Sequence, residues 1–253
     1  MEYFFALLAS VLAGFINTLS GSGSLIMVPM LMWLGLPAPI ANGTNRVAIV
    51  FQSAIGVRTY FKNMPLEIGS AWWVIIPGVA GACIGAFLAT ITSAALLEQL
   101  IGVLMIVMLF IILLKPTKWL KEEPAAVTKE RTWMSQVMMF AIGLYGGFIQ
   151  GGVGVFLLIG MVMFTGYSVR YSNAIKLLIV AIYALPVLVI FIIQNQIDWK
   201  IGLFTAVGQG FGAHLGALFA TRHPNANLWT YRLLIVVLLA AIIEFYKPYN
   251  YFL

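Results

Sequence analysis

Glycine and small polar residues gather at two places in an otherwise apolar chain, and their types suit the binding of an anion. The first place is the run SGSGS at 20–24, and the second is the run QGGVG at 150–154. A helix that begins at such a glycine break presents N–H groups without intrahelical acceptors and the positive end of its dipole. Anions bind to helix N-termini of this kind, and glycine lets a ligand approach the backbone closely. We therefore predict that the two breaks together hold one small anion.

Two basic residues and several amides accompany the breaks. Arg46 lies a little over one turn into the predicted helix 41–62, and Lys176 is similarly placed in the predicted helix 172–194. Ionisable groups inside a membrane segment are costly and usually face a cavity or the interior of a bundle. One cation on each side of the membrane midplane could attract an anion from either face. The predicted substrate-binding residues are Asn17, Ser20, Gly21, Ser22, Gly23, Ser24, Asn42, Thr44, Asn45, Arg46, Gln150, Gly151, Gly152, Gly154, Asn173 and Lys176.

The sequence argues against several other kinds of chemistry. It contains no nucleophile–base pair, no metal-ligand spacing and no phosphate-binding loop, so we predict no enzyme activity, no metal and no cofactor. Every acidic residue except Glu244 falls at a predicted terminus or loop, which leaves carboxylate-dependent coupling without an obvious carrier. His214, deep in segment 200–221, is the central group that could titrate near neutral pH, and it is the candidate for proton coupling.

Each interpretation has a structural alternative. The glycine breaks could serve only the close packing of helices. Arg46 and Lys176 could extend to the membrane surface with their apolar stems buried. Asn42 and Asn173 could cap the helices that they begin. His214 could be a satisfied polar residue of the bundle with no role in proton transfer.

The composition predicts a membrane protein. Residues of the types AVILMFWYC make up 62% of the chain, charged residues make up 9%, and the mean hydropathy is +1.01. A soluble domain carries roughly 25% charged residues, because its surface must be solvated. This chain can cover its surface only with lipid, so we predict an all-α polytopic membrane protein. Its expected partners are the bilayer and a small anion, and the net charge of +6 reflects membrane orientation and not nucleic-acid binding.

Ten apolar segments are expected, at 3–19, 24–36, 41–62, 69–91, 96–114, 133–150, 153–166, 172–194, 200–221 and 229–246. Segments 24–36 and 153–166 are too short to span a bilayer, and each follows a glycine break. Short, glycine-interrupted segments at corresponding places in two halves indicate discontinuous helices of a transporter. Whether each broken pair crosses fully or forms a re-entrant hairpin stays open. We predict a first repeat at 1–114, a cytoplasmic linker at 115–132 and a second repeat at 133–253.

Basic residues predict the orientation. With the 115–132 linker in the cytoplasm, all but three of the 14 Lys and Arg residues lie on the cytoplasmic side, in agreement with the positive-inside rule. Both termini then face outward. The expected location is the inner (plasma) membrane of a cell.

The two halves share a sequence repeat. Segment 81–90 matches segment 212–221, and at the same offset Gly21 matches Gly152 and Asn42 matches Asn173. Each half contains an odd number of effective crossings, so the halves are predicted to be inverted repeats whose breaks meet near the midplane. The glycine pairs 81/85 and 212/216 are assigned to helix packing, within one protomer or in a homodimer.

The glycine-rich break, Val28-Pro29 and the run ANGTN at 41–45 together resemble the sulfite exporter TauE/SafE family. The break at 151–154 and the glycine-spaced helices of both halves match the duplicated layout of that family. The second half reads SNAIK at 172–176, so the halves do not match there. The resemblance covers nearly the whole chain and implies transport of sulfite or organosulfonates.

These features predict a secondary transporter of small anions that works by alternating access. An anion channel would share the helix dipoles and the cations, but it would conduct far faster than a carrier. A membrane-embedded enzyme is a third and weaker alternative.

Overall fold

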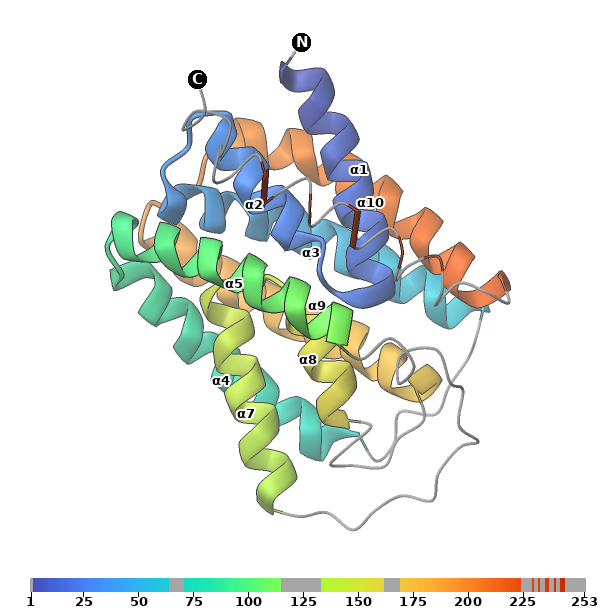
Figure 1. Cartoon of the computed structure of the whole chain (residues 1–253). Helices are drawn as coiled ribbons and strands as arrows, with labels where there is room; N and C mark the ends of the chain where they lie inside the picture. Colours follow the sequence, from blue (N-terminus) through green and yellow to red (C-terminus); the bar gives the residue numbers. More distant parts are fainter. Residues whose placement is uncertain are drawn as a thin grey trace.

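The computed structural model describes residues 2–63, 71–114, 133–161 and 169–223, together with isolated residues between 229 and 243. Within these ranges the secondary structure is entirely helical (Figure 1). The predicted linker 115–132 and most of segment 229–246 lie outside the described residues. The helices are α1 (Glu2–Ser20), α2 (Ser24–Trp33), α3 (Ala38–Asn63), α4 (Trp72–Ile91), α5 (Ala94–Leu114), α7 (Trp133–Phe148), α8 (Val153–Gly160), α9 (Val169–Ile193) and α10 (Trp199–Arg222).

Four of the described helices are long and apolar enough to cross a membrane, which confirms the membrane class. They lie in α1, α4, α9 and α10. The 26-residue helix α3 is not among them, although it contains the predicted apolar segment 41–62. Most polar residues of its first four turns, including Asn45, Arg46 and Gln52, are buried inside the bundle. A helix shielded by neighbouring helices need not match the polarity of lipid.

Glycines allow two pairs of helices to pack with their backbones in contact. In the first pair, a Cβ atom added at Gly85 of α4 would lie 1.8 Å from the carbonyl oxygen of Leu144 in α7. In the second, a Cβ atom at Gly212 of α10 would lie 2.0 Å from the carbonyl oxygen of Val11 in α1. Small residues are what close packing of membrane helices requires. The structure thus confirms the packing role predicted for these glycines, and places it within one protomer.

We expect Gly85→Ala to destabilise the protein, because its Cβ would meet backbone that cannot rotate away. Overpacking of this kind costs about 1–3 kcal/mol. Gly56→Ala in α3 is the matched control, since its Cβ would find only ordinary contacts at 3.5 Å or more, and Ala favours a helix over Gly by about 1 kcal/mol. Thermal unfolding of the purified variants in detergent should therefore show a lower midpoint for Gly85→Ala and an equal or higher one for Gly56→Ala. Equal midpoints below that of the wild type would contradict the packing assignment.

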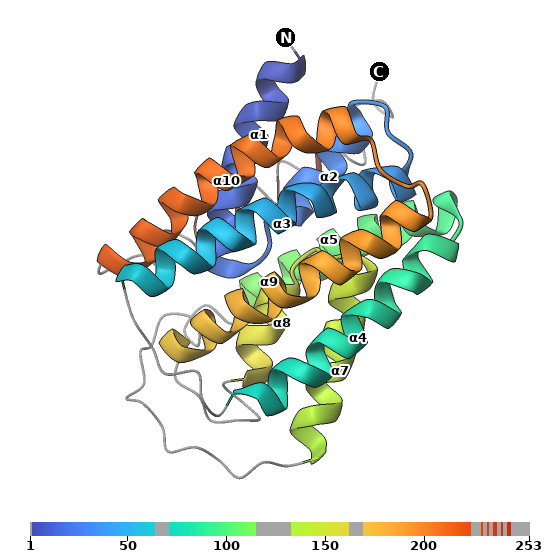
Figure 2. The same cartoon turned by 180° about the vertical axis from the view of Figure 1, so that it is seen from behind.

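The helices form two structural units, each containing a helix from the other half of the sequence. In one unit α1 packs on α2 and α10, and α3 packs on α2 and α10. In the other, α7 packs on α8 and α4, and α9 packs on α8 and α4. Figures 1 and 2 show the first unit above the second. Helix α3 of the first unit and α9 of the second lie side by side where the units meet. Helices at corresponding positions of the two halves therefore make corresponding contacts, with α4 and α10 exchanged between the units.

The two broken helix pairs approach the centre of the molecule from opposite ends. In both views α1 starts at the upper end and runs down, whereas α7 starts at the lower end and runs up (Figures 1 and 2). Buried apolar side chains of α4, α7, α8 and α9 form one hydrophobic core, and those of α1, α2, α5 and the start of α3 form another. The glycine breaks that follow α1 and α7 lie between these cores, where the two units meet.

Candidate functional site

Both breaks turn the chain through a left-handed backbone conformation. Helix α1 ends at Ser20, Gly21 has φ +76°, and α2 begins at Ser24. Helix α7 ends at Phe148, and Gly152, with φ +72°, is the residue before α8. An interruption of this kind starts a new helix whose first N–H groups lack intrahelical acceptors. The sequence therefore breaks the helices within the glycine runs at 20–24 and 150–154.

The two breaks touch one another through their backbones. The N–H of Gly154 donates to the carbonyl oxygen of Gly21 at 3.3 Å. A Cβ atom added at Gly21 would lie 2.2 Å from the Cα of Gly154, so no side chain fits between the backbones of the two breaks. In this conformation the space between these two glycines cannot hold an anion. A ligand reaching that point would require the breaks to separate.

Arg46 of α3 binds the end of α7. Its guanidinium donates to the carbonyl oxygens of Gly146 at 3.0 Å and Gly147 at 2.6 Å, to Gln150 Oε1 at 2.6 Å, and to Asn42 Oδ1 at 3.3 Å. The last carbonyls of a helix have no intrahelical donor and carry its negative dipole end, so a cation stabilises them. Arg46 thus closes the C-terminus of the helix that precedes the second break.

Lys176 of α9 makes the corresponding contact in the other direction. Its Nζ donates to the carbonyl oxygens of Thr18 at 3.2 Å and Leu19 at 3.1 Å, at the end of α1. Each unit therefore sends a cation to the broken helix of the other unit. Arg46 and Lys176 are both 1% exposed, so the alternative that they extend to the membrane surface is wrong.

The amide and hydroxyl groups predicted to surround the breaks are mostly engaged in holding the units together. Asn42 Nδ2 donates to the carbonyl oxygen of Phe148 at 2.8 Å, and Asn45 Nδ2 donates to Ser24 Oγ at 3.0 Å. Thr44 Oγ1 accepts from the N–H of Asp198, before α10, at 2.9 Å. Helix α3 is thereby bonded to both breaks and to the start of α10.

Asn42 and Asn173 do not cap their own helices. Helix α3 begins at Ala38 and α9 at Val169, so both asparagines lie within the helix and not at its N-cap. The alternative that they serve as helix caps is therefore wrong. Asn42 instead binds the end of α7, while Asn173 Oδ1 is buried without a hydrogen-bond partner in the described structure.

Several buried polar atoms close to the breaks have no hydrogen-bond partner among the described residues. Most buried polar groups in proteins are satisfied, so each exception needs an explanation. Four of them belong to residues of the predicted site, and the fifth belongs to Ser172 near the start of α9. They are Ser22 Oγ, Arg46 Nε and Gln150 Nε2, with Ser172 Oγ and Asn173 Oδ1.

Three further residues complete the site, and the sequence carried no signal for them. Tyr183 of α9 donates its hydroxyl to Gln150 Oε1 at 3.0 Å. The Arg46 guanidinium lies 5.4 Å from the centre of the Phe191 ring, within the range of a cation–π interaction. Gln209 of α10 donates to Asn45 Oδ1 at 3.1 Å. All three lie in apolar stretches far from the breaks in sequence, so only the packing of the helices brings them here.

Some predicted residues have roles away from any ligand in this conformation. The Ser20 hydroxyl donates to the carbonyl oxygen of Ile16 within α1 at 3.0 Å, and the carbonyl oxygen of Asn17 accepts from the N–H of Gly21 at 2.8 Å. His214 is exposed on α10, and its Nδ1 is 3.1 Å from Thr59 Oγ1 of α3. It makes no described contact with either break. Among the described residues no cluster of three metal-ligating side chains occurs.

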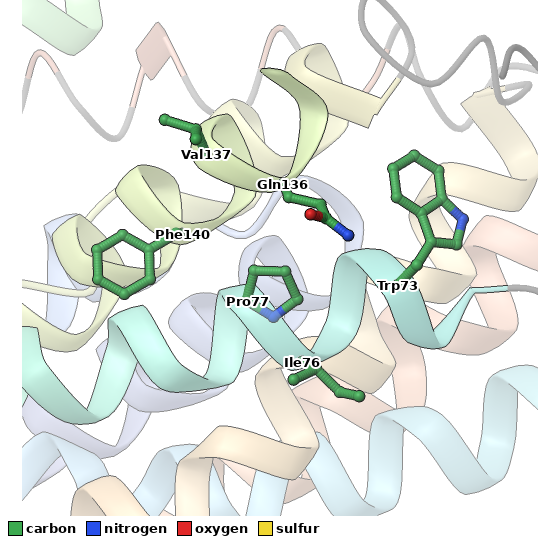
Figure 3. Close-up of a pocket in the computed structure, with 6 residues that line it drawn as sticks. All are labelled: Trp73, Ile76, Pro77, Gln136, Val137 and Phe140. Carbon is green, nitrogen blue, oxygen red and sulfur yellow. The ribbon is translucent and has the colours of Figure 1, made fainter. Parts of the chain in front are cut away.

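A groove of about 500 Å³ lies elsewhere, between the first turns of α4 and α7 (Figure 3). It is open to the outside of the bundle, and none of the residues at the breaks lines it. Its walls are mainly apolar and none of the residues that line it is basic, so it lacks the positive charge expected of an anion site. The lining residues are Trp73, Ile76, Pro77, Gln136, Val137 and Phe140.

Comparison with known proteins identifies the family of this chain. The family model for the sulfite exporter TauE/SafE matches residues 6–245. The chain belongs to the TauE/SafE family. It is 27% identical over 216 residues to a probable membrane transporter protein, ORF9, of Sinorhizobium sp., with 85% of this chain and 82% of the relative covered. It is 24% identical over 229 residues to the probable membrane transporter protein YdhB of Bacillus subtilis, with 87% and 90% covered.

These relatives are named as probable membrane transporter proteins, and the four described helices that could cross a membrane make this TauE/SafE protein a multi-pass membrane protein. A third relative, a probable membrane transporter protein of Haemophilus influenzae, is 25% identical over 206 residues, with 81% of this chain and 80% of the relative covered. No solved structure matches the chain.

Proposed function

We propose that this protein is a secondary transporter of small anions, and that the anion is held close to the two glycine breaks during alternating access. The observation that carries the proposal is the pair of buried cations, Arg46 and Lys176. Within the described ranges no carboxylate lies close enough to either to form an ion pair, and the groups that they contact there are neutral carbonyl, amide and aromatic groups.

Buried charge without a counter-charge is expensive. Removing an ammonium or guanidinium from water costs several kcal/mol. The interaction with the carbonyl groups at a helix end offsets only part of this free energy. A residue that carries such a cost inside a membrane protein marks a functional site by default. A transported anion would supply the missing negative charge when it reaches the breaks.

Alternating access is supported by the paired arrangement of the helices. The halves are proposed to be inverted repeats, because α1 and α7 enter from opposite ends and corresponding helices make corresponding contacts. A site between two inverted units can open to either side when the units rock against each other. The contact between Gly21 and Gly154 would be closed in one state and separated in another.

The chemical nature of the anion is a finer proposal. The family description, sulfite exporter, supports sulfite or an organosulfonate as substrate. The cation count of the loops supports a cytoplasmic 115–132 linker and outward-facing termini in an inner membrane. A homodimer is also part of the proposal, although the Gly81/Gly85 and Gly212/Gly216 faces are used inside the protomer.

We expect liposomes containing the purified protein to take up labelled sulfite in a saturable way. Sulfate, methanesulfonate and chloride, added as competitors, would rank the substrates. Protein-free liposomes measure the leak, and electrical recording under the same gradients separates a carrier from an anion channel, because channel currents far exceed carrier rates. If folded protein takes up none of the four anions, each labelled in turn, the proposal of anion transport is wrong and the description of the fold is unaffected.

A further inference from the structure

Gln150, at the break between α7 and α8, has an unusual backbone conformation. It has φ +70°, a left-handed conformation that glycine adopts freely and glutamine adopts at a cost. The next two residues, Gly151 and Gly152, are glycines, whereas position 150 carries a long amide side chain. Strain of this kind persists where a side chain is needed in a fixed place, and such places cluster at functional sites.

Two donors fix the orientation of the Gln150 amide. Arg46 donates to its Oε1 at 2.6 Å, and Tyr183 donates to the same oxygen at 3.0 Å. A guanidinium has no acceptor, so the atom facing Arg46 must be the amide oxygen and not the nitrogen. The amide nitrogen therefore points away from both partners. Gln150 is 0% exposed, and its Nε2 has no hydrogen-bond partner in the described structure.

Arg46 carries a second unpartnered donor beside the first. Its terminal nitrogens are bonded to carbonyls and to Gln150, whereas its Nε is buried without a partner among the described residues. Because the guanidinium and the amide meet at 2.6 Å, Arg46 Nε and Gln150 Nε2 belong to the same small region. Two N–H donors, one of them on a cation, thus have no acceptor among the residues that the structure describes. A ligand that fits them must bring acceptor atoms and negative charge.

Lys176 differs from Arg46 in this respect. Its Nζ is not among the unpartnered buried atoms, since it donates to the carbonyl oxygens of Thr18 and Leu19. The pseudo-symmetric arrangement of the cations therefore does not extend to their unpartnered nitrogens. Among the described residues, Arg46 Nε at the break after α7 has no acceptor, whereas the single nitrogen of Lys176 is held at the break after α1 by two of its three N–H groups.

We propose that the anion binds directly to Arg46 Nε and Gln150 Nε2 at the break between α7 and α8, and that Tyr183 is a positioning residue that holds the amide in its binding orientation. The site is asymmetric: Lys176 adds positive charge but no direct contact. This inference rests on the proposed anion transport and names the side of the paired site that the anion touches. It also assigns a role to Tyr183, which lies in no motif.

The test compares two tyrosines of the same break. Tyr183→Phe removes the hydroxyl that orients Gln150. Tyr145→Phe is the matched control, because the Tyr145 hydroxyl donates to the carbonyl oxygen of Gly151 and not to Gln150. Both should lower the melting temperature modestly. Only Tyr183→Phe should raise the Kd and the KM for sulfite, by about tenfold with kcat within twofold, because the amide is then free to turn.

Gln150→Glu supplies a second, independent variant. Its carboxylate would replace the amide donor by an acceptor and would pair with Arg46 as an internal counter-ion. We expect an equal or higher melting temperature and at least a 100-fold weaker response to sulfite. Binding is measured in detergent as the rise in melting temperature with added sulfite, and transport is measured as uptake into liposomes.

The outcomes separate this inference from the proposed function. If the wild type binds and transports sulfite, but Tyr183→Phe and Tyr145→Phe have the same Kd and KM, the asymmetric site is wrong and anion transport stands. If Gln150→Glu keeps the wild-type Kd, the direct contact is wrong in the same way. If the wild type neither binds nor transports sulfite, sulfate, methanesulfonate or chloride, both proposals fall together.

Discussion

Arg46→Gln is expected to reduce the rate of anion uptake about 100-fold at low substrate concentration while the protein still folds. The variant removes the buried charge and the Nε donor. A hydrogen bond to a charged group contributes about 1.5–3 kcal/mol, and 2.8 kcal/mol corresponds to about 100-fold. Folding should survive, because Gln at this position can still donate to one carbonyl at the end of α7. The measurement is labelled sulfite uptake with the melting temperature determined on the same preparation.

Arg46→Lys and Lys176→Gln are the informative comparisons. Arg46→Lys retains the charge but loses the planar fork that contacts Gly146, Gly147 and Gln150 together. It should recover only part of the uptake. Lys176→Gln should lower the melting temperature and the maximal rate more than it changes the KM, since its Nζ binds α1 and not the anion. Wild-type uptake in folded Arg46→Gln would show that Arg46 serves only to close α7.

Gly21→Ala is expected to destabilise the protein by about 4 kcal/mol. Two costs add here. Alanine at φ +76° is strained by about 1–2 kcal/mol, and its Cβ would lie 2.2 Å from the Cα of Gly154. That second atom belongs to the backbone, so the contact can be relieved only by separating the breaks, at about 1–3 kcal/mol. Thermal unfolding in detergent measures the effect.

Gly35→Ala isolates the conformational part of that cost. Gly35 has φ +91°, yet a Cβ atom added there would find nothing within 4 Å. It should therefore lose about 1–2 kcal/mol of stability and keep wild-type uptake. If Gly21→Ala and Gly35→Ala lowered the melting temperature equally, the contact between the breaks would contribute nothing to stability. A loss of uptake confined to Gly21→Ala would support the closed contact as a step in transport.

The positions of most helices followed from hydropathy and glycine. The breaks at 20–24 and 150–154, the short helices after them, and the long helices α4, α9 and α10 lie where the sequence places them. These features are local, because a glycine run interrupts a helix and an apolar run of sufficient length can span a bilayer, whatever surrounds them. The prediction that 41–62 is an apolar segment was wrong because the polarity that a helix tolerates is not a local property. Whether Asn45 and Gln52 face lipid or protein depends on neighbours that hydropathy does not identify.

The partners of the cations could not be predicted. The spacing of Arg46 and Lys176 after each break predicts that both lie near a ligand site, and the structure shows that both side chains are buried. Their bonds reach residues 100 and 158 positions away, at the ends of α7 and α1. The role of Tyr183 could not be predicted for the same reason. A tyrosine in an apolar helix carries no sequence signal that shows which group its hydroxyl will bond.

The sequence by itself determined that the chain lies in a membrane, where its helices break, and which residues carry charge beside the breaks. These properties depend on composition and on neighbours within a few positions. Only the tertiary structure decided that α4 and α10 exchange between the units and that each cation closes the broken helix of the other unit. It also decided that, among the described residues, Gln150 Nε2 and Arg46 Nε have no acceptor. Those outcomes depend on which helices pack together, because a buried donor must find its acceptor in space and not along the chain.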